Sequence, residues 1–364
     1  MSRASTESRA NLIARLLSGA WRIEIPPLEM SAEQLAEIAP LLLGSGAGAL
    51  GWRRVKDCHL RSSFAGLELQ QAYRHHTLQA ALHERDIKES FALLRSRGIE
   101  PVLVKGWSIA RLYSEKGLRP YEDIDLVIRE DQFAAAQAVM KEQGDRQYFF
   151  DLHRGFKTLD NRAHVDLFGS SRLIRLGEAD VRALRPEDHL RVLCLHLLHH
   201  GAFRPLWLCD VAVAVESRPA DFDWGRCLGE NRRVADWVAC TIGLAHRLLG
   251  AQAEDTPAAH RAKDLPAWLI QNVLKQWENP LPKNHGVSKH RAPMVNYLRH
   301  PAGMLEDLRN RWPGPLEATV NMRGPFNELP RLPFQLAECA SRAAKFLAQI
   351  PEALRAEQSS VDPA

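Results

Sequence analysis

Two aspartates one residue apart, Asp123 and Asp125, lie in a run that otherwise alternates like a buried strand, RPYEDIDLVI at residues 119–128. In an extended chain their carboxylates point to one face, while Ile124 and Leu126 point to the other. The two α-carbons are then roughly 6.5–7 Å apart, and the like charges need water, a basic group or a cation between them. A hydrophobic core gains nothing from this pair, so the spacing indicates a chemical site.

A third acidic residue of the same kind follows later in the chain. Asp166 in AHVDLFG is a single acid in a strand-like run, and we expect residues 164–168 to form a strand next to the one that carries Asp123 and Asp125. Mg²⁺ prefers oxygen ligands, and two ions about 3.5–4 Å apart can hold the attacking and leaving oxygens of a phosphoryl transfer. The three aspartates together predict a site for Mg²⁺ or Mn²⁺.

An anion site is predicted upstream of the acidic pair. In VLVKGWSIARLY, Lys105 and Gly106 stand where a short strand ends and a helix begins. Free backbone N–H groups favour an anion there, and a glycine lets a phosphate approach the backbone. Because one helix and one turn separate this point from Asp123, both can return to the same end of a sheet. A metal-bound nucleoside triphosphate would fit between them.

These residues resemble a known pattern, that of the nucleotidyltransferases of the DNA polymerase β superfamily, and more closely their uncharacterised bacterial branch. The pattern in this chain consists of Lys105, Gly106, Tyr113, Arg119, Asp123, Ile124, Asp125 and Leu126, and the likeness extends over about residues 85–220. The resemblance implies that Asp123 and Asp125 bind metal and that Asp166 completes the catalytic triad. It also implies that Gly106 shapes a phosphate loop, with nucleotide contacts from Lys105, Ser108 and Arg119.

The implied activity is transfer of a nucleoside monophosphate from a nucleoside triphosphate, with ATP as the expected nucleotide, to a hydroxyl group, with release of pyrophosphate. The acceptor is a small molecule, a peptide or a protein side chain, and a protein partner in a biosynthetic pathway is possible. Two alternatives stay open. One is a glycosyltransferase that uses Asp-x-Asp to hold a metal and a nucleotide sugar, and the other is a non-catalytic regulator that binds the triphosphate with the same fold.

The elements that must position these residues predict an α+β protein. Strands are expected at 101–105, 123–128 and 164–168, around RQYFFD at 146–151 and near GFKTL at 155–159, in a small mixed sheet with helices on one face. A helix is expected directly after Lys105, and another from Asp131 to Gln143. The sheet is the expected nucleotidyltransferase core.

Four regions are predicted along the chain: an N-terminal helical region at 1–84, the core at 85–175, a C-terminal helical domain at 176–350 and a flexible tail at 351–364. Apolar periodicity predicts a long helix from Leu67 to Gly98, and a Ser-x-x-Gln cap opens a helix from Ser31 to Leu43. Helices continue beyond residue 185, residues 278–334 are predicted to be loop-rich, and a last helix is expected at about 333–348.

Composition indicates an ordinary globular protein. The 48 Lys and Arg against 44 Asp and Glu give a net charge of +4, and the positive charges are scattered, so nucleic-acid binding is not indicated. The six cysteines form no CxxC pair, which favours reduced thiols. We find no export signal and no run of 18 apolar residues, so the expected location is the cytoplasm, without a membrane association.

Other motifs have simpler interpretations. His196 and His200 are spaced to bind zinc from one helical face, but packing of the His196, His199 and His200 group against Trp207 or Asp210 is the preferred reading. His153 and His164 are taken as structural. The GxGxxG match at 46–51 follows a predicted helix rather than a strand, so we expect a turn. A protein-kinase reading fails because no glycine-rich loop shortly precedes Lys105.

Overall fold

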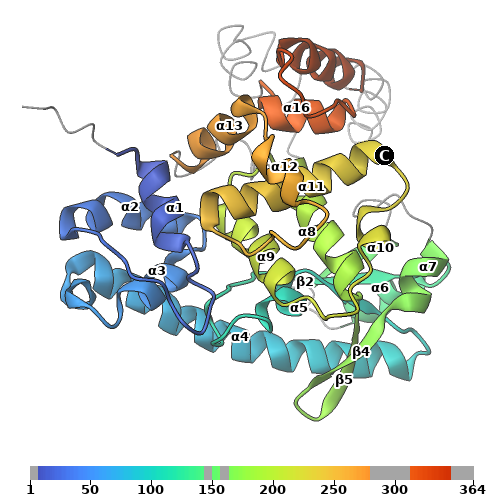
Figure 1. The fold of residues 1–364 in the computed structure, drawn as a ribbon. Helices are drawn as coiled ribbons and strands as arrows, with labels where there is room; N and C mark the ends of the chain where they lie inside the picture. Colours follow the sequence, from blue (N-terminus) through green and yellow to red (C-terminus); the bar gives the residue numbers. More distant parts are fainter. Residues whose placement is uncertain (1–6, 143–149, 156–163, 279–311, 346–364) are drawn as a thin grey trace, which may run out of the picture.

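The computed structural model describes residues 7–142, 150–155, 164–278 and 312–345. Within these ranges the protein is an α+β fold, as predicted: one five-stranded sheet lies among many helices (Figure 1). Outside the described residues lie the predicted strand segment 156–159, the N-terminal half of the RQYFFD segment and the predicted tail 351–364.

The sheet is small and mixed. Its strands follow the order β3-β2-β1-β5-β4, and their bounds are β1 Val102–Val104, β2 Ile124–Ile128, β3 Phe150–Arg154, β4 Arg172–Leu176 and β5 Ala179–Ala183. β1 runs antiparallel to β2 and parallel to β5, and β2 runs parallel to β3. The predicted strands at 101–105 and 123–128 are confirmed. Of the strand predicted around 146–151, the described part belongs to β3, which runs from Phe150 to Arg154.

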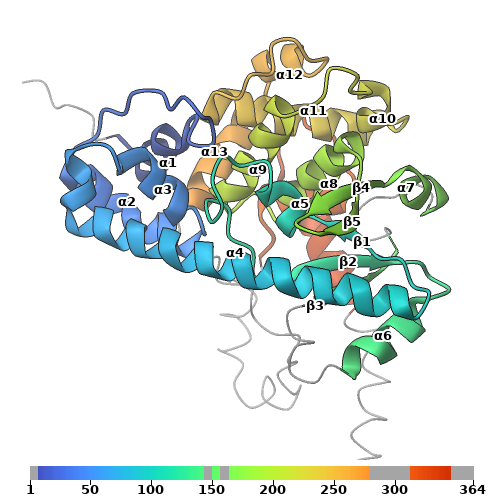
Figure 2. The ribbon, with the colours of Figure 1, turned by 90° about the horizontal axis from the view of Figure 1, so that it is seen from below.

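Helices cover both faces of this sheet, so the prediction of helices on one face only is wrong. On one face, helix α4 (Phe64–Ser96) and helix α6 (Phe133–Lys141) bury the β2 side chains Leu126 and Ile128. On the other face, Val127 of β2 packs with Val192 of helix α8 (Pro186–His199). Figure 2 shows α4 along one side of the sheet and α8 beyond it. Since Asp125 alternates with Leu126, its carboxylate points toward the α8 side.

Two N-terminal helices, at residues 32–44 and 48–55, pack onto α4. The capping box at Ser31 and Gln34 is confirmed at the start of helix α2 (Ala32–Gly44), after helix α1 (Arg9–Leu17). The GAGALG segment is not a simple turn, because helix α3 (Gly48–Val55) begins inside it. A β-carbon at Gly51 would lie 3.2 Å from Leu69 of α4, so the glycine permits close packing of the two helices.

The segment between β3 and α8 differs most from expectation. Residues 164–168, predicted as a strand, begin helix α7 (His164–Ser170), whose Leu167 is buried and whose Ser170 hydroxyl accepts a hydrogen bond of 2.6 Å from Arg226. A short apolar run does not distinguish helix from strand, which explains the error. The β4–β5 hairpin was not predicted, and its two-residue turn contains Gly177 at φ +59°.

The C-terminal half is helical, as expected. Its further helices are α9 Pro205–Glu216, α10 Trp224–Leu228, α11 Arg232–Leu249, α12 Ala259–Lys263, α13 Ala267–Trp277, α16 Pro315–Asn321 and residues 332–345. Helix α16 lies within the span predicted to be loop-rich. None of the helices in the described part of the chain is long and apolar enough to cross a membrane.

The predicted domain boundaries stay predictions. The boundary at 84/85 falls inside the continuous helix α4, and β5 pairs with β1 although it follows residue 175. The five-residue helix α5 (Gly106–Ala110) lies between β1 and the turn that precedes β2, and is shorter than expected.

A buried ion pair holds this turn against helix α9. The Arg119 side chain is 8% exposed and donates to both carboxylate oxygens of Asp210, which is 1% exposed, with a closest distance of 2.8 Å. The Tyr113 hydroxyl donates to the same carboxylate at 2.8 Å. Because the turn leads directly into β2, this network fixes the positions of Asp123 and Asp125.

We predict that Asp210→Ala lowers the free energy of unfolding by about 3–5 kcal/mol, because it leaves the buried Arg119 guanidinium without its counter-charge. Asp255→Ala is the control, since Asp255 is 73% exposed in its ion pair with Arg218 and its loss should change stability by less than about 0.5 kcal/mol. Urea denaturation followed by circular dichroism measures both. Equal effects of the two substitutions would contradict the role given to Asp210.

Candidate active site at the edge of the sheet

The site begins where β1 ends. Register pairs Val104 of β1 with Asp125 of β2, and the next residue, Lys105, extends its ammonium to within 2.7 Å of the Asp125 carboxylate. Lys105 has φ +51°, which is uncommon for a residue with a β-carbon, and Gly106 follows at φ +36°. This tight turn at the strand end places the lysine side chain next to the acidic strand.

The Lys-Gly turn also contacts the first aspartate of the pair. A β-carbon built on Gly106 would lie 3.5 Å from the backbone oxygen of Asp123, which is ordinary contact distance. The structure therefore brings together Lys105, Gly106, Asp123 and Asp125 at one end of β1 and β2, as the sequence predicted for the strand, helix, strand unit. A side chain at position 106 has room, so the left-handed backbone is the constraint that favours glycine there.

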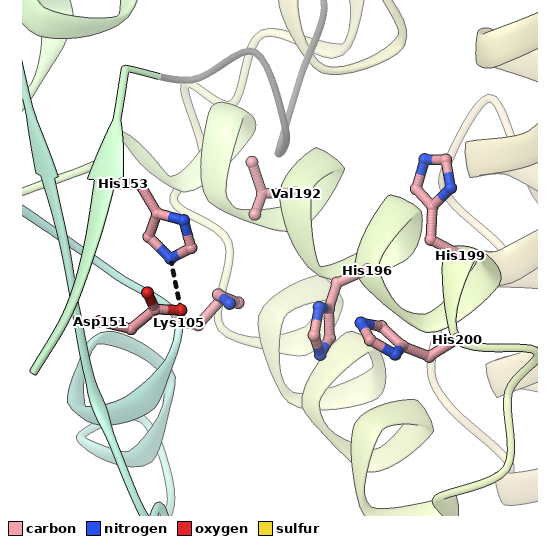
Figure 3. A pocket seen from close by; sticks show the side chains of 7 residues that line it. All are labelled: Lys105, Asp151, His153, Val192, His196, His199 and His200. Carbon is pink, nitrogen blue, oxygen red and sulfur yellow. Dashed lines mark ion pairs between the residues drawn. The ribbon is translucent and has the colours of Figure 1, made fainter. Parts of the chain in front are cut away.

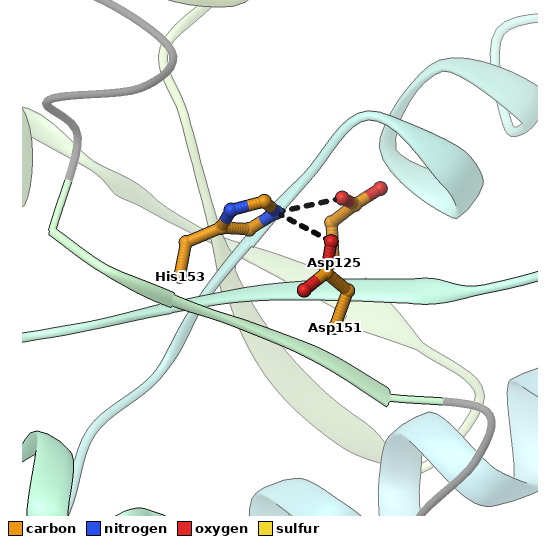
Figure 4. A group of neighbouring side chains, drawn as sticks. All are labelled: Asp125, Asp151 and His153. Atoms are coloured by element: carbon orange, nitrogen blue, oxygen red, sulfur yellow. Dashed lines mark hydrogen bonds and ion pairs between the residues drawn. The ribbon is translucent and has the colours of Figure 1, made fainter. Parts of the chain in front are cut away.

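The neighbouring strand β3 adds two groups that the sequence did not assign to the site. Parallel pairing sets Asp151 opposite Asp125 and His153 opposite Val127, so both side chains lie on the face of the Asp125 carboxylate. His153 Nε2 lies 2.8 Å from Asp125 Oδ1 and 3.4 Å from Asp151 Oδ2 (Figure 4). The Asp-x-His spacing in FDLHR repeats the Asp-x-Asp spacing of β2, and this was the signal that could have revealed the pair.

Asp125 of β2 and Asp123, which directly precedes this strand, have opposite pKa shifts. Burial by itself would raise the pKa of Asp125, but the hydrogen bond from His153 and the charge of Lys105 outweigh it and lower that pKa. The pKa of Asp123 is raised, first by loss of hydration and then by the negative charge of Asp125. Since Asp123 remains open to solvent, we give more weight to the like charge. A cation between them would relieve this repulsion.

A cavity of ≈ 230 Å³ lies between this cluster and helix α8. Figure 3 shows Lys105, Asp151 and His153 on its sheet side and histidines of α8 on the opposite side. In the described part of the chain, the cavity is lined by Lys105, Asp151, His153, Val192, His196, His199 and His200. The cluster is thus reachable from a hollow that the core and the C-terminal helices form together.

Two of the three histidines predicted to pack against Trp207 do so: His196 of α8 and His200, which follows the helix. The ring centroid of Trp207 lies 4.6 Å from that of His196 and 5.2 Å from that of His200. Burial, followed by the positive charge of Lys105, holds the pKa of His196 well below its usual value. His196 is therefore a neutral imidazole at neutral pH, which can both donate and accept a hydrogen bond at the cavity wall.

Two predicted nucleotide contacts have protein partners in this arrangement. The Ser108 hydroxyl is buried and donates to the Leu103 backbone oxygen at 3.2 Å, and the Arg119 guanidinium is engaged by Asp210. The Asp166 side chain lies outside what the structure describes, although its backbone lies in α7 rather than in a strand. The roles of Ser108, Arg119 and Asp166 stay predictions.

The donor set fits a divalent cation. Three possible ligand atoms lie within 4.8 Å of one another: one oxygen each of Asp125 and Asp151 and one nitrogen of His153. Asp125 is buried, His153 is partly buried and Asp151 is exposed. Two carboxylates and an imidazole are common ligands of divalent metals, and the cavity gives an ion a path to them. Asp123 is not a member of this group, but its carboxylate lies near enough that, after burial, the charges of Asp125 and Asp151 also raise its pKa.

An Asp-x-Asp pair at the start of β2, in a small mixed sheet and next to a Lys-Gly turn, is the arrangement expected from the resemblance to nucleotidyltransferases. A family described as "uncharacterised nucleotidyltransferase" matches residues 46–250, more than half of the chain, and the protein belongs to this family. No curated protein and no solved structure matches the chain.

A second buried histidine of α8 makes stability depend on pH. His189 is 5% exposed, and its Nε2 has no hydrogen-bond partner among the residues the structure describes. Burial, then the charges of Arg111 and Arg119, lower the pKa of His189 to about 3. Between that value and the ordinary value near 6.5, the unfolded chain binds a proton at this residue that the folded chain does not.

We therefore predict that the free energy of unfolding falls as the pH is lowered below about 6.5, with a contribution from His189 of at most about 1.4 kcal/mol per pH unit. His189→Gln should make this slope shallower. Urea denaturation at intervals between pH 6.5 and 5, above the range in which most carboxylates titrate, measures it. A slope unchanged in the variant would show that His189 is protonated in the folded protein too.

Proposed function

We propose that the protein is a divalent-metal-dependent nucleotidyltransferase that moves a nucleoside monophosphate from a nucleoside triphosphate to a hydroxyl group and releases pyrophosphate. The observation that carries this proposal is that Lys105, Asp151 and His153 line one cavity, while the buried Asp125 lies within 2.7 Å of Lys105 and 2.8 Å of His153. Membership of a nucleotidyltransferase family supports the reaction class. Mg²⁺ and ATP are the partners predicted from the sequence.

The metal would be held by carboxylates of two adjacent strands. Asp123 and Asp125 supply the pair expected from the family pattern, and Asp151 supplies a third carboxylate from β3. When bound, the metal polarises the phosphoryl oxygens and stabilises the charge that develops in the transfer. The buried Asp125 contributes most of the rigidity, because its side chain is only 4% exposed.

Lys105 and Gly106 would hold the phosphates. The Lys105 ammonium lies in the cavity lining and now neutralises Asp125. Once a cation takes over that neutralisation, the ammonium can bind the triphosphate instead, as a point charge. Gly106 exposes no side chain at the start of α5, so a phosphate oxygen can come close to the backbone there.

The acceptor would enter from the α8 side of the cavity. Among the described residues, Asp151 is the single carboxylate of the cavity lining, and Lys105 adds a positive charge there, so this lining favours an uncharged or anionic acceptor over a polycation. Neutral His196 can hydrogen-bond to a hydroxyl group. Asp151, whose side chain is 55% exposed, would take the hydroxyl proton on the carboxylate oxygen that does not hold the metal.

We predict that Asp123→Asn and Asp125→Asn each reduce pyrophosphate release from ATP with Mg²⁺ or Mn²⁺ by on the order of 10²–10³-fold, because removing a metal ligand costs several kcal/mol of transition-state stabilisation. Labelled nucleotides and candidate hydroxyl acceptors give the measurement. Asp131→Asn is the control, since Asp131 is 66% exposed and pairs with Arg129. Activity that survives both site variants would refute the assignment, and binding of nucleotide and metal without turnover would favour the regulator.

The third carboxylate is tested by a matched pair of variants. We expect Asp151→Asn to weaken Mn²⁺ binding by at least about tenfold, as loss of a metal-site group does, and Asp166→Asn to leave it nearly unchanged. Isothermal titration calorimetry with MnCl₂ compares them. If Asp166→Asn causes the larger loss, the role predicted from the sequence is right and Asp151 has only a structural part.

A further inference from the structure

We propose that His153 Nε2 is a direct metal ligand, which makes the cluster a mixed nitrogen and oxygen site that favours Mn²⁺, Co²⁺ or Zn²⁺ over Mg²⁺. This inference rests on the proposed function only in that the same cluster binds the cation. It departs from the expectation of a purely carboxylate site, which the three aspartates Asp123, Asp125 and Asp166 suggested.

The spacing of the donor atoms fits a coordination shell. Metal to nitrogen and metal to oxygen bonds of about 2.1 Å place neighbouring ligand atoms about 3.0 Å apart at right angles and about 3.4 Å apart at tetrahedral angles. The observed separations from His153 Nε2 are 2.8 Å to Asp125 Oδ1 and 3.4 Å to Asp151 Oδ2. Small shifts of these side chains would admit an ion without rearrangement of the strands.

The backbone fixes these ligands in advance. Asp151 and His153 are two residues apart on β3, and β3 is paired residue by residue with β2 from Ile124 to Ile128. Asp125 and His153 are 4% and 15% exposed, so neither side chain is free to leave the group. A metal site built on paired strands in this way holds its geometry better than one built on loops.

The kind of donor decides which metal is favoured. Mg²⁺ requires near-ideal octahedral oxygen coordination and keeps several waters, whereas imidazole suits zinc, cobalt and related ions, and Mn²⁺ accepts carboxylates together with imidazole. Two carboxylates and a neutral imidazole carry two negative charges, which a divalent ion balances. Lys105, which now shares Asp125 Oδ1 with His153, is then available for phosphate.

The histidines of α8 belong to the opposite wall of the cavity. They line the same hollow, but in the described part of the chain they do not join the group of ligand atoms that lie within 4.8 Å of one another. His199 is therefore a matched control for His153: both line the cavity, and only His153 is placed to bind the ion. The competing explanation is that His153 only donates a hydrogen bond that orients Asp125.

Electron spin-echo envelope modulation of the full-length protein loaded with Mn²⁺ alone separates these two roles. Direct ligation predicts a ¹⁴N modulation that changes when the histidines are labelled with ¹⁵N, which requires no variant. We expect His153→Gln to abolish the modulation and to weaken Mn²⁺ binding at least about tenfold, with a smaller effect on Mg²⁺. His199→Gln should leave both unchanged.

Absence of a ¹⁴N modulation in the wild type, or its persistence in His153→Gln, would overturn the inference. Loss of the modulation in His199→Gln but not in His153→Gln would show that the nitrogen ligand comes from helix α8, and this result would also overturn the inference. Nucleotide turnover is read separately. If the ion has a nitrogen ligand but the protein releases no pyrophosphate, the proposed function is wrong and this inference stands. If the protein releases pyrophosphate in a reaction that depends on Asp125 but the ion has no nitrogen ligand, this inference is wrong and the proposed function stands.

Discussion

The burial of one carboxylate constrains the rest of the site. Asp125 lies within a sheet that is covered on both faces, and an ionised carboxylate there is tolerated only when positive charge or hydrogen bonds replace the water it has lost. Lys105 and His153 provide both, from the two strands on either side of β2. Lys105, in the turn after β1, and His153, positioned by the register of β3, therefore both contact the same oxygen atom, Asp125 Oδ1. The same oxygen is the natural place for a divalent cation.

The helical half of the protein completes this arrangement. Helix α9 holds the chain ahead of β2 through Asp210, and helix α8 closes the cavity opposite the cluster. Helix α8 is itself fixed near its start, where the fully buried Asp188 pairs with Arg226 of α10 at 2.7 Å. The core supplies the charged groups, while the helices supply the opposite wall of the cavity. The candidate site is thus formed by the core and the C-terminal helices together.

The part of this site that lies close together in sequence could be predicted. Asp123 and Asp125 can be recognised in the sequence because an acidic pair interrupts an otherwise strand-like apolar run. The Lys105–Gly106 turn is recognised because it follows a short apolar strand. The long helix α4 and the cap of α2 follow from local periodicity and hydrogen bonding. These features depend on residues a few positions apart.

The remainder depends on pairing over long distances along the chain. Asp151 and His153 join the site only because β3 pairs in parallel with β2, and nothing in the local pattern of residues 150–154 specifies that register. The helical conformation of residues 164–168 arises from packing of Leu167 on α8, which a five-residue apolar run does not reveal. Coverage of the second sheet face by α8 was missed for the same reason. The local sequence pattern identified the first residues of the candidate site, and the pairing of distant strands determined which further residues join them.

The central claim is that Asp125 and its neighbours hold a divalent ion beside a cavity that binds the nucleotide. A crystal grown with a non-hydrolysable nucleoside triphosphate and Mn²⁺ tests this most directly, through the anomalous scattering of manganese. We predict an anomalous peak in contact with Asp125, and a triphosphate that reaches Lys105. A nucleotide bound elsewhere, or a cavity that contains nucleotide while Lys105 still neutralises Asp125 and no manganese is present, would contradict the account.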